Sequence, residues 1–237
     1  MANIIRNLLS MNPRFAVSLL KTMLTPRSGA DALGFRSFCE DSGFEFTTAW
    51  ADKNIPFVAP VLRAFARGRD NIRYLEIGAY EGRNLAFMRW LDPAPLSVTV
   101  IDPWFDDALN PEEKYREIEP RFYRNVAKLG FLAFTAEKGF STYILPEMLR
   151  KGSKFDLIYI DGSHTSWAVN IDLSYCAALL EVGGMIILDD YWHAVSEIGG
   201  PGVKQAVDNF HAMFGSYFEL SAVYRQVILT KLADLPR

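Results

Sequence analysis

Runs of apolar residues alternate along the chain with segments whose apolar positions have helical spacing. Five runs have the length of buried strands: 73–77, 96–101, 131–135, 155–161 and 185–188. The helical segments before, between and after them are 54–67, 82–90, 110–130, 166–180 and 203–214. Strands separated by helices predict a parallel sheet with right-handed crossovers, and two last runs, 217–223 and 226–231, predict a closing strand pair. The sequence therefore predicts an α/β fold with a doubly wound, Rossmann-like sheet.

The N-terminal residues have a different pattern. Apolar positions in residues 1–24 follow helical spacing and basic residues interrupt them, which is typical of amphipathic helices and not of a secretion signal or a membrane span. Asn12 and Pro13 read as a helix cap and a first-turn proline. We therefore expect a short helix on either side of Asn12, the second ending near Pro26.

Mixed signals follow in residues 28–51, which predict a loop-rich connector. The chain is accordingly divided into an N-terminal helical cap and connector, 1–53, and a main domain, 54–237. Amphipathic helices of this kind bury their apolar face. We expect the cap to pack on the sheet or on a second copy of the chain in a homo-oligomer, with a lid or a membrane-surface helix as the alternatives.

The first strand leads into a turn that contains two glycines. Glu76 is followed by Gly78 and Gly82, and a helical segment begins directly after them. A strand, a tight turn and a helix start present backbone N–H groups to a ligand in open α/β sheets. Tyr80 stands where the dinucleotide fingerprint has a second glycine, so its side chain fills the space that a pyrophosphate needs. The Glu76 carboxylate repels phosphate and favours a cationic or ammonium-bearing ligand.

This stretch, residues 75–82, resembles motif I of the class I S-adenosylmethionine-dependent methyltransferases, in the form found in catechol O-methyltransferase. The resemblance extends over about residues 54–232 and implies S-adenosylmethionine as the cofactor. It also implies a mostly parallel sheet whose last strand runs antiparallel to its neighbours. By the same matching, the glycine turn and five further positions fall on cofactor contacts: Gly78 and Gly82, with Glu76, Tyr80, Asn84, Asp102 and Ser141.

Two positions after later strands suit a nucleoside. Asp102 ends the second strand about 20 residues after the glycine turn, where an acid accepts hydrogen bonds from ribose hydroxyls. Phe140 and Ser141 follow the third strand and would lie beside the adenine, with the Phe140 ring stacked on the base. The alternatives are an ordinary turn aspartate and a core aromatic residue.

Carboxylates also follow the fourth and fifth strands. Asp161 ends the fourth, and Asp189 and Asp190 follow the fifth. Because the carboxyl ends of parallel strands emerge at one edge of a sheet, these carboxylates converge. Ionised carboxylates at one place repel one another, and a divalent cation relieves that repulsion. Oxygen donors favour Mg²⁺, with Mn²⁺ and Ca²⁺ as alternatives, over zinc.

His164, three residues after Asp161, is the candidate general base. Taking a proton from an alcohol of pKa near ~16 with an imidazole of pKa about 6.5 leaves a gap of roughly 9 units, or on the order of 12 kcal/mol. A divalent cation closes most of this gap by acidifying the hydroxyl that it holds. His164 would then remove a proton from an already acidic group. The structural alternative is a loop histidine with ordinary partners.

The resemblance adds detail to this set. Asp161, Asp189 and Asp190 look like the metal-ligand positions of catechol O-methyltransferase and of the related macrolide-sugar and cephalosporin-tailoring methyltransferases. His164 stands where the catechol enzyme has a lysine base. The histidine, and Asp190 in place of an amide, resemble the sugar and antibiotic branch, which implies a hydroxyl of a sugar or natural product as the acceptor. Three residues begin the loop that would shape the substrate pocket: Tyr191, Trp192 and His193.

The composition agrees with an enzyme that acts on small molecules. The 237 residues carry 25 basic and 28 acidic side chains with no basic stripe, so a nucleic-acid partner is not expected. Cys39 and Cys176 are far apart and lie among apolar neighbours, which predicts buried free thiols in a reducing cytoplasm. Two other functions stay open. One is a nicotinamide-dependent (NAD(P)) oxidoreductase or epimerase, against which Tyr80 and Glu76 argue, and the other is a non-catalytic cofactor-binding module.

Overall fold

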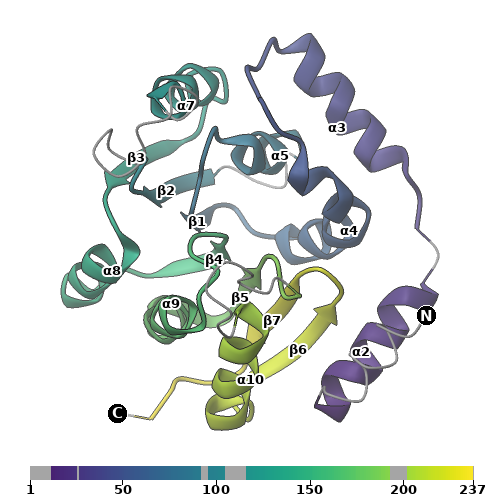
Figure 1. Ribbon diagram of the computed structural model, residues 1–237, viewed down its shortest axis with the longest axis vertical. Coiled ribbons are helices and arrows are strands. Elements are labelled where there is room, and N and C mark those ends of the chain that lie inside the picture. The colour runs from purple at the N-terminus through teal and green to yellow at the C-terminus, as the bar shows by residue number, and fades with distance from the viewer. Residues whose placement is uncertain (1–11, 26, 92–95, 105–115, 193–201, 237) are drawn as a thin grey trace.

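The computed structural model describes residues 12–25, 27–91, 96–104, 116–192 and 202–236. Within these residues seven strands form one sheet that runs through the middle of the molecule (Figure 1). The strands are β1 (Ile72–Ile77), β2 (Leu96–Asp102), β3 (Ala133–Lys138), β4 (Phe155–Ile160), β5 (Leu180–Leu188), β6 (Phe218–Val223) and β7 (Val227–Lys231). Their order in the sheet is β3-β2-β1-β4-β5-β7-β6.

The direction of the strands confirms the predicted fold class. β3, β2, β1, β4 and β5 pair in parallel, and β7 pairs antiparallel with both β5 and β6. The crossovers start from β1 and move outward in both directions, first to β2 and β3 and then to β4 and β5. This is a doubly wound sheet, in which ligands bind outside the carboxyl ends of the strands where the two directions separate.

Helices cover both faces of this sheet. They are α2 (Pro13–Leu24), α3 (Ala30–Asp41), α4 (Ile55–Ala66), α5 (Arg83–Leu91), α7 (Ile118–Val126), α8 (Ser141–Arg150), α9 (Ser166–Leu179) and α10 (Val203–Phe214), with a short 3₁₀ helix, η1 (Trp50–Asn54). In Figure 1, α8, α9 and α10 lie on one side of the sheet and α4, α5 and α7 on the other, with α3 outside α4 and α5.

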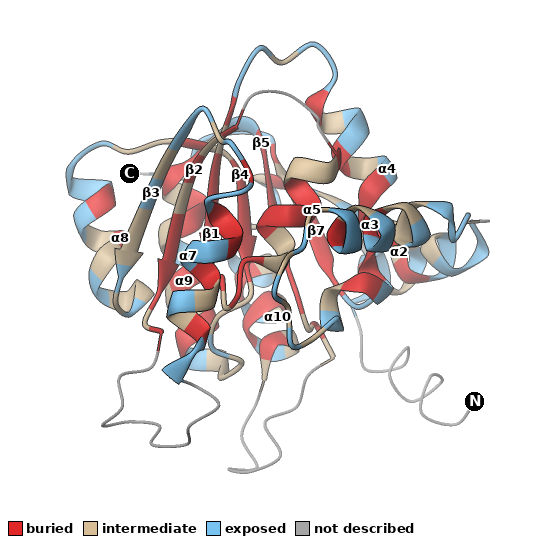
Figure 2. Ribbon diagram, turned by 90° about the horizontal axis from the view of Figure 1, so that it is seen from above, coloured by how far each residue is buried: buried red, intermediate tan, exposed pale blue. Residues whose placement is uncertain are grey.

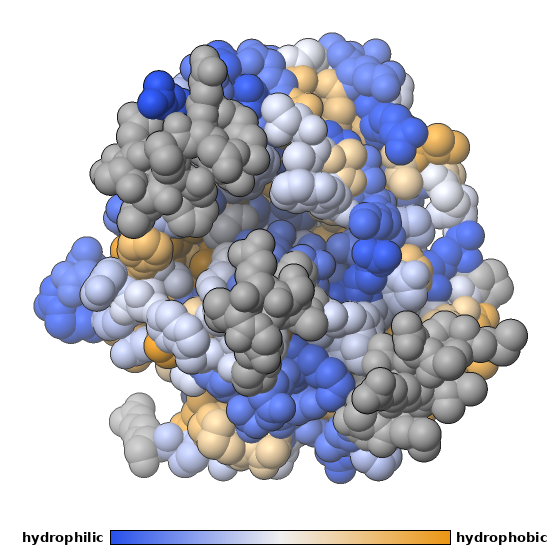
Figure 3. Space-filling view, viewed as in Figure 1, coloured by the Kyte–Doolittle hydropathy of each residue, from blue (hydrophilic) through white to orange (hydrophobic). Residues whose placement is uncertain are grey.

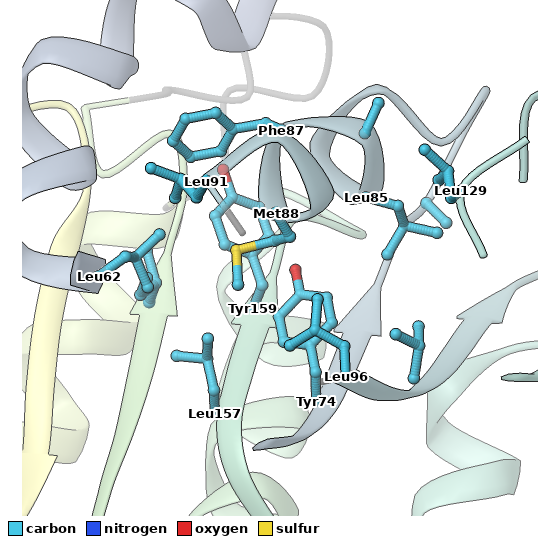
Figure 4. Close-up of a cluster of buried hydrophobic side chains, with 14 of the residues drawn as sticks. Leu62, Tyr74, Leu85, Phe87, Met88, Leu91, Leu96, Leu129, Leu157 and Tyr159 are labelled. Carbon is cyan, nitrogen blue, oxygen red and sulfur yellow. The ribbon is translucent and has the colours of Figure 1, made fainter. Parts of the chain in front are cut away.

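Successive residues of a strand point to opposite faces, and here both faces are apolar. In β1, Leu75 and Ile77 join the core under α8 to α10, whereas Ile72 and Tyr74 join the core under α4, α5 and α7. Figure 4 shows part of this second core, including Tyr74 of β1. The central strands are accordingly buried, and β3 at the edge is partly exposed (Figure 2).

The helix predicted after Asn12 is present as α2. The Asn12 side chain accepts a hydrogen bond from the Arg14 backbone N–H (2.9 Å), Pro13 starts the helix, and Thr25 caps its end. Its buried residues, Phe15 and Leu19, join the core under α10, so the helix packs beside β6. The helix predicted before Asn12 lies outside the described residues.

The loop-rich connector predicted for 28–51 was wrong over its first half, which forms α3. Gly34 weakens the helical signal of this segment in the sequence, but a Cβ at this position would meet the Trp90 ring at 3.0 Å. The glycine thus permits a close contact between helices. Phe35 and Cys39, one turn apart, are buried against α4 and α5, and tertiary packing of that face holds the helix.

Three other predicted boundaries differ from the structure. The fifth strand, predicted over 185–188, starts earlier as β5 at Leu180 and includes the two glycines at 183 and 184. The third strand, predicted over 131–135, is β3 at 133–138, because an edge strand lacks the continuous apolar run that marks buried strands. Of the helix predicted over 110–130, the structure has α7 at 118–126, and residues 105–115 lie outside the described ranges. Both cysteines are free and buried as predicted. No helix within the described ranges has the length and apolar character of a membrane span.

The turn after β1 depends on close approach of two strand ends. Gly78 has φ +85°, and a Cβ there would lie 2.1 Å from the backbone carbonyl oxygen of Asp161 at the end of β4. Only glycine meets both requirements, because other residues strain at this φ and would also overlap the carbonyl. The position therefore controls how closely the ends of β1 and β4 can lie.

Gly78→Ala is expected to destabilise the protein by more than ~4 kcal/mol or to prevent folding, since the strain at positive φ adds to a direct overlap. Gly68→Ala is the matched control, because Gly68 has φ +75° but no atom within 4 Å of a Cβ at that position. Thermal unfolding of both variants measures the difference. If both variants lose the same stability, the overlap with the Asp161 carbonyl does not contribute to the cost of Gly78→Ala.

Candidate active site at the carboxyl edge of the sheet

Backbone hydrogen bonds continue past the strands and draw their ends together. Gly78 N–H donates to the Ile101 carbonyl (2.9 Å), Asp161 N–H to the Ile77 carbonyl (2.8 Å) and Asp189 N–H to the Ile160 carbonyl (3.0 Å). The residues that follow β1, β2, β4 and β5 therefore meet at one edge. This edge faces the viewer in Figure 3, and hydrophilic residues occupy much of the surface between the grey atoms.

Three non-glycine residues at this edge have positive φ. They are Tyr80 (φ 48°) after β1, Trp104 (φ 34°) after β2 and Asp190 (φ 51°) after β5. Backbone strain of this kind persists only where the surrounding structure holds it, and it gathers at ligand sites. The strained residues thus lie beside two of the predicted sites, the glycine turn and the carboxylate pair after β5.

Glu76 lies under the glycine turn in a small polar cluster. Its Oε2 accepts hydrogen bonds from the Tyr74 hydroxyl (2.6 Å) and from the Asn84 side-chain amide (3.1 Å). The side chain is 1% exposed, and burial raises the pKa of Glu76 to about 8, although both hydrogen bonds oppose the shift. A buried carboxyl of this kind favours ionisation only when a cationic group comes close.

Asp102 holds the glycine turn from the neighbouring strand. Its two carboxylate oxygens accept hydrogen bonds from the backbone N–H groups of Tyr80 (2.9 Å) and Trp104 (2.7 Å). Burial raises the pKa of Asp102, and these backbone N–H groups oppose the shift. Each oxygen keeps a further lone pair, so binding of a ribose hydroxyl remains compatible with this role.

Phe140 and Ser141 follow β3, as predicted, and lie at the start of α8, a helix that the sequence analysis did not predict. Phe140 precedes the helix in an extended conformation, and Ser141 is its first residue. The Phe140 ring is 47% exposed and belongs to neither buried core. The expectation of a plain core aromatic therefore does not apply to it, and its exposed face is open to stacking.

Asp161, His164 and Asp190 form a compact group at the same edge. Their ligand atoms lie within 4.8 Å of one another. His164 Nε2 is 3.7 Å from Asp161 Oδ1 and 3.4 Å from Asp190 Oδ2, and about a third of each of the side chains of His164 (32%) and Asp161 (35%) is exposed. Loss of hydration raises the pKa of Asp161 to about 7, while the Asp161 carboxylate raises the pKa of His164.

Asp189, predicted as a metal ligand, points to different partners. The Asn54 amide donates to both of its carboxylate oxygens (3.1 and 3.2 Å), and the Tyr159 hydroxyl donates to Oδ2 (2.6 Å). Gln226 in turn donates to the Tyr159 oxygen (2.7 Å). The structure therefore does not place the Asp189 carboxylate in the compact group of Asp161, His164 and Asp190.

Buried charges fasten the segment before α4 to the glycine turn. Glu81, 1% exposed, accepts hydrogen bonds from the backbone and hydroxyl of Thr47 (2.6 and 2.8 Å) and from Arg121 (2.6 Å). Asp52 and Arg83 form a bidentate pair at 2.8 Å. The sequence pattern did not indicate these residues or Asn54, because partners 31 to 135 positions apart leave no local signal.

The residues predicted to begin a substrate loop have structural partners. Tyr191 is fully buried, with its ring stacked near Phe15 and its hydroxyl donating to Asp208 (3.2 Å), so it cannot line a substrate pocket. The Trp192 indole N–H donates to the Tyr224 carbonyl (2.7 Å). His193 lies outside the described residues. The aromatic residues before it thus anchor the end of β5 in the core.

Comparison with known proteins agrees with this geometry. Residues 75–191, from β1 to the residues after β5, match the family described as a methyltransferase domain. The match covers just under half of the chain, and together with the sheet order it agrees with the class I methyltransferases that the glycine turn resembles. It favours a methyltransferase over the alternative of a nicotinamide-dependent oxidoreductase. No match to a curated protein was found.

Solved methyltransferase structures share the fold. The MycE methyltransferase from the mycinamycin biosynthetic pathway, in complex with Mg, SAH and mycinamycin VI, has a TM-score of 0.58 and 14% identity over 85% of this chain and 55% of its own. TomG from Streptomyces achromogenes is involved in tomaymycin synthesis and was solved with SAM. Its TM-score is 0.54 and its identity 17%, over 93% of this chain and 98% of TomG. An O-methyltransferase from Bacillus cereus in complex with SAH has a TM-score of 0.53 and 14% identity, over 93% of this chain and 99% of its own. The chain thus spans about half the length of MycE.

The buried carboxyl of Glu76 yields a pH prediction for the ligand-free protein. Since the folded pKa of about 8 lies above the usual 4.5, the contribution of Glu76 to stability is complete below about pH 4.5 and is lost as the pH rises through 8. The difference in Tm between Glu76→Gln and the wild type should therefore grow in favour of the variant from pH 4.5 to 8 and then level off.

The measurement is thermal unfolding across this pH range in the presence of a chelator. Glu147→Gln is the control, because Glu147 is an exposed carboxylate on α8 whose pKa its partner Arg150 lowers. Its difference in Tm should not grow toward pH 8. A constant difference for Glu76→Gln would contradict the assignment of a buried charge.

Proposed function

We propose that the protein transfers a methyl group from S-adenosylmethionine to a hydroxyl of a small molecule with the help of a divalent cation. One observation carries the proposal. The compact group of Asp161, His164 and Asp190 lies at the same sheet edge as Glu76 and the Gly78 turn, where a Cβ on Gly78 would lie only 2.1 Å from the Asp161 carbonyl oxygen. A methyl donor at the turn and an acceptor at the acidic group would thus be neighbours.

The turn suits S-adenosylmethionine because this ligand carries an ammonium and a sulfonium. Glu76 is buried with a raised pKa, so a cationic ligand would restore its ionised form and gain a charge-assisted contact. Tyr80 and Gly82 shape the turn, while Asn84 holds the Glu76 carboxylate. Asp102 would bind the ribose, and Phe140 and Ser141 would lie beside the adenine. The MycE structure is a complex with SAH and the TomG structure a complex with SAM, which supports the same cofactor here.

The acidic group suits a hard divalent cation. Asp161 and Asp190 offer oxygen ligands at one place, and the pKa of Asp161 near 7 reflects the cost of leaving its charge without a cation. Asp189 raises the pKa of Asp161 further, so its charge acts on the same place. Because each carboxylate oxygen has two lone pairs, Asp189 can keep Asn54 and Tyr159 as donors and still serve as the proposed third ligand. We propose Mg²⁺, which the MycE complex contains.

In this arrangement the chain's own residues do three things. The glycine turn holds the donor, so the methyl carbon has one fixed direction of attack. Asp161 and Asp190 would hold the cation, which when bound would supply the acidification of an acceptor hydroxyl. His164, whose pKa Asp161 raises, accepts the proton that this hydroxyl loses. The methyl group then moves from sulfur to oxygen and leaves neutral S-adenosylhomocysteine.

Removal of the metal tests the first part of this proposal. A chelator, or Asp161→Asn, should lower kcat at least 100-fold because the acceptor hydroxyl loses its acidification, while S-adenosylmethionine binding measured by calorimetry should be retained. Asp70→Asn is the control and should keep full activity, because Asp70 is exposed and precedes the amino end of β1, opposite the carboxyl edge. Full activity of the chelated enzyme would remove the metal from the proposal.

Replacement of the base tests the second part. His164→Gln should lower kcat by about 100-fold to 10,000-fold and remove the acidic limb of the pH–rate profile, since no group remains to accept the proton. His211→Gln is the control, because His211 packs edge-on against Phe15 (4.9 Å between ring centroids) under α10. An unchanged pH–rate profile for His164→Gln would exclude the histidine as the base.

A further inference from the structure

A cavity of about 470 Å³ is lined in part by Asn54, the hydrogen-bond partner of Asp189, and has no role in the account above. The end of α2 and the residues after it, the first half of α4 and the β6–β7 hairpin line it. The carboxyl edge of the sheet passes directly under it, because Val227 at the start of β7 pairs with Leu188 at the end of β5. The cavity is therefore one layer of side chains away from Asp189.

The floor of this cavity has an unused hydrogen-bond acceptor. Asn54 is 6% exposed and its Nδ2 donates to Asp189, which fixes the orientation of the amide. Its Oδ1 is buried and has no hydrogen-bond partner within the described parts of the chain. An orphan acceptor in a buried position is costly unless a ligand or water donates to it. Asn54 thus holds Asp189 through its Nδ2, has an unsatisfied Oδ1 and belongs to the lining of the cavity.

The opposite side of the cavity is basic. Lys21 and Arg27 both line it, and neither forms an ion pair with a described residue. The one carboxylate in the lining, Asp31, is held by Arg63 in a bidentate pair at 2.8 and 2.9 Å. Partial burial lowers the pKa of Arg27, as expected for a guanidinium without a counter-ion. The cavity thus carries two cationic groups whose charge the described lining leaves uncompensated.

Aromatic rings form the wall between the two ends. The rings of Phe57 and Tyr224 stack at 3.9 Å with an angle of 15° between their planes, and the Arg27 guanidinium lies 3.9 Å from the Phe57 centroid. This contact orients the guanidinium while its N–H groups remain available, because no residue in the described part of the chain accepts a hydrogen bond from them. A planar, preorganised guanidinium binds carboxylate or phosphate in bidentate fashion.

We propose that this cavity binds the part of the methyl acceptor remote from the reacting hydroxyl, and that the acceptor is a small hydroxylated anion, a carboxylic acid or a phosphate. The inference rests on the proposed methyl transfer. The anionic group lies on Arg27 and Lys21, the body of the molecule lies along Phe57 and Tyr224, and a hydroxyl or N–H group donates to Asn54 Oδ1. The reacting hydroxyl then extends past Asn54 toward Asp190 and His164.

Matched pairs of probes test this inference by calorimetry with Mg²⁺ and S-adenosylhomocysteine present. One pair is 3,4-dihydroxybenzoate and 3,4-dihydroxybenzamide, and the other is glucose 6-phosphate and glucose, so that carboxylate and phosphate are tested separately. At least one anion should bind tenfold or more tightly than its neutral partner. Arg27→Gln should reduce this preference to less than threefold, and Lys21→Gln should reduce it partly.

Arg36→Gln is the matched control, because Arg36 is an exposed arginine on α3 outside the cavity lining, and it should keep the full preference. No preference for either anion by the wild type, or an undiminished preference in Arg27→Gln, overturns the inference. S-adenosylmethionine binding is measured in parallel for each variant. A protein that prefers the anion but does not bind S-adenosylmethionine would refute the proposed methyl transfer and leave an anion site, so the two failures are distinguishable.

Discussion

The contact between the Gly78 backbone and the Asp161 carbonyl governs the candidate site. A side chain of any size at position 78 would force the ends of β1 and β4 apart, because a Cβ would lie 2.1 Å from that carbonyl. The turn that would hold the methyl donor and the strand end that carries the acidic group are therefore as close as two backbones can be. Alignment of donor and acceptor follows from this closeness, and alignment is the main requirement of a direct methyl transfer.

Charge is the second constraint on this edge. Glu76, Asp161 and Asp189 all have pKa values raised by burial, and within the described residues His164 is the cationic group that approaches Asp161 and Asp190. Such a site is unfavourable without ligands and becomes favourable when cations arrive. A sulfonium donor near Glu76 and a divalent cation at Asp161 would each compensate negative charge, at two neighbouring places.

The segment before α4 connects these constraints. Thr47 and Asp52 fasten it to the glycine turn through Glu81 and Arg83, and Asn54 at its end holds Asp189. The same Asn54 forms the floor of the basic cavity. The donor turn, the Asp189 carboxylate and the cavity therefore share one short stretch of backbone, although the family match begins only at residue 75. A substitution in this stretch would therefore alter all three places.

The order of strands and helices, the glycine turn and the carboxylates after β4 and β5 could be predicted from the sequence, because each depends on residues close together in the chain. The spacing of apolar residues predicts the strands and their order along the chain. Because parallel strands end at one edge, Glu76, Asp102, Asp161 and Asp190 are predicted to lie in the same region. The helix α3 could not be predicted, because Gly34 weakens its local signal and the Trp90 contact that explains the glycine is not local.

Tertiary structure alone decided which carboxylate faces which partner. Asp189 and Asp190 are neighbours in sequence, yet one is held by Asn54, 135 positions away, and the other faces His164. The burial of Tyr191 and the cavity between α2, α4 and β7 have the same origin. Side-chain direction at a strained turn such as Asp190, with φ 51°, depends on the packing around it, and a local pattern of residue types carries no information about that packing.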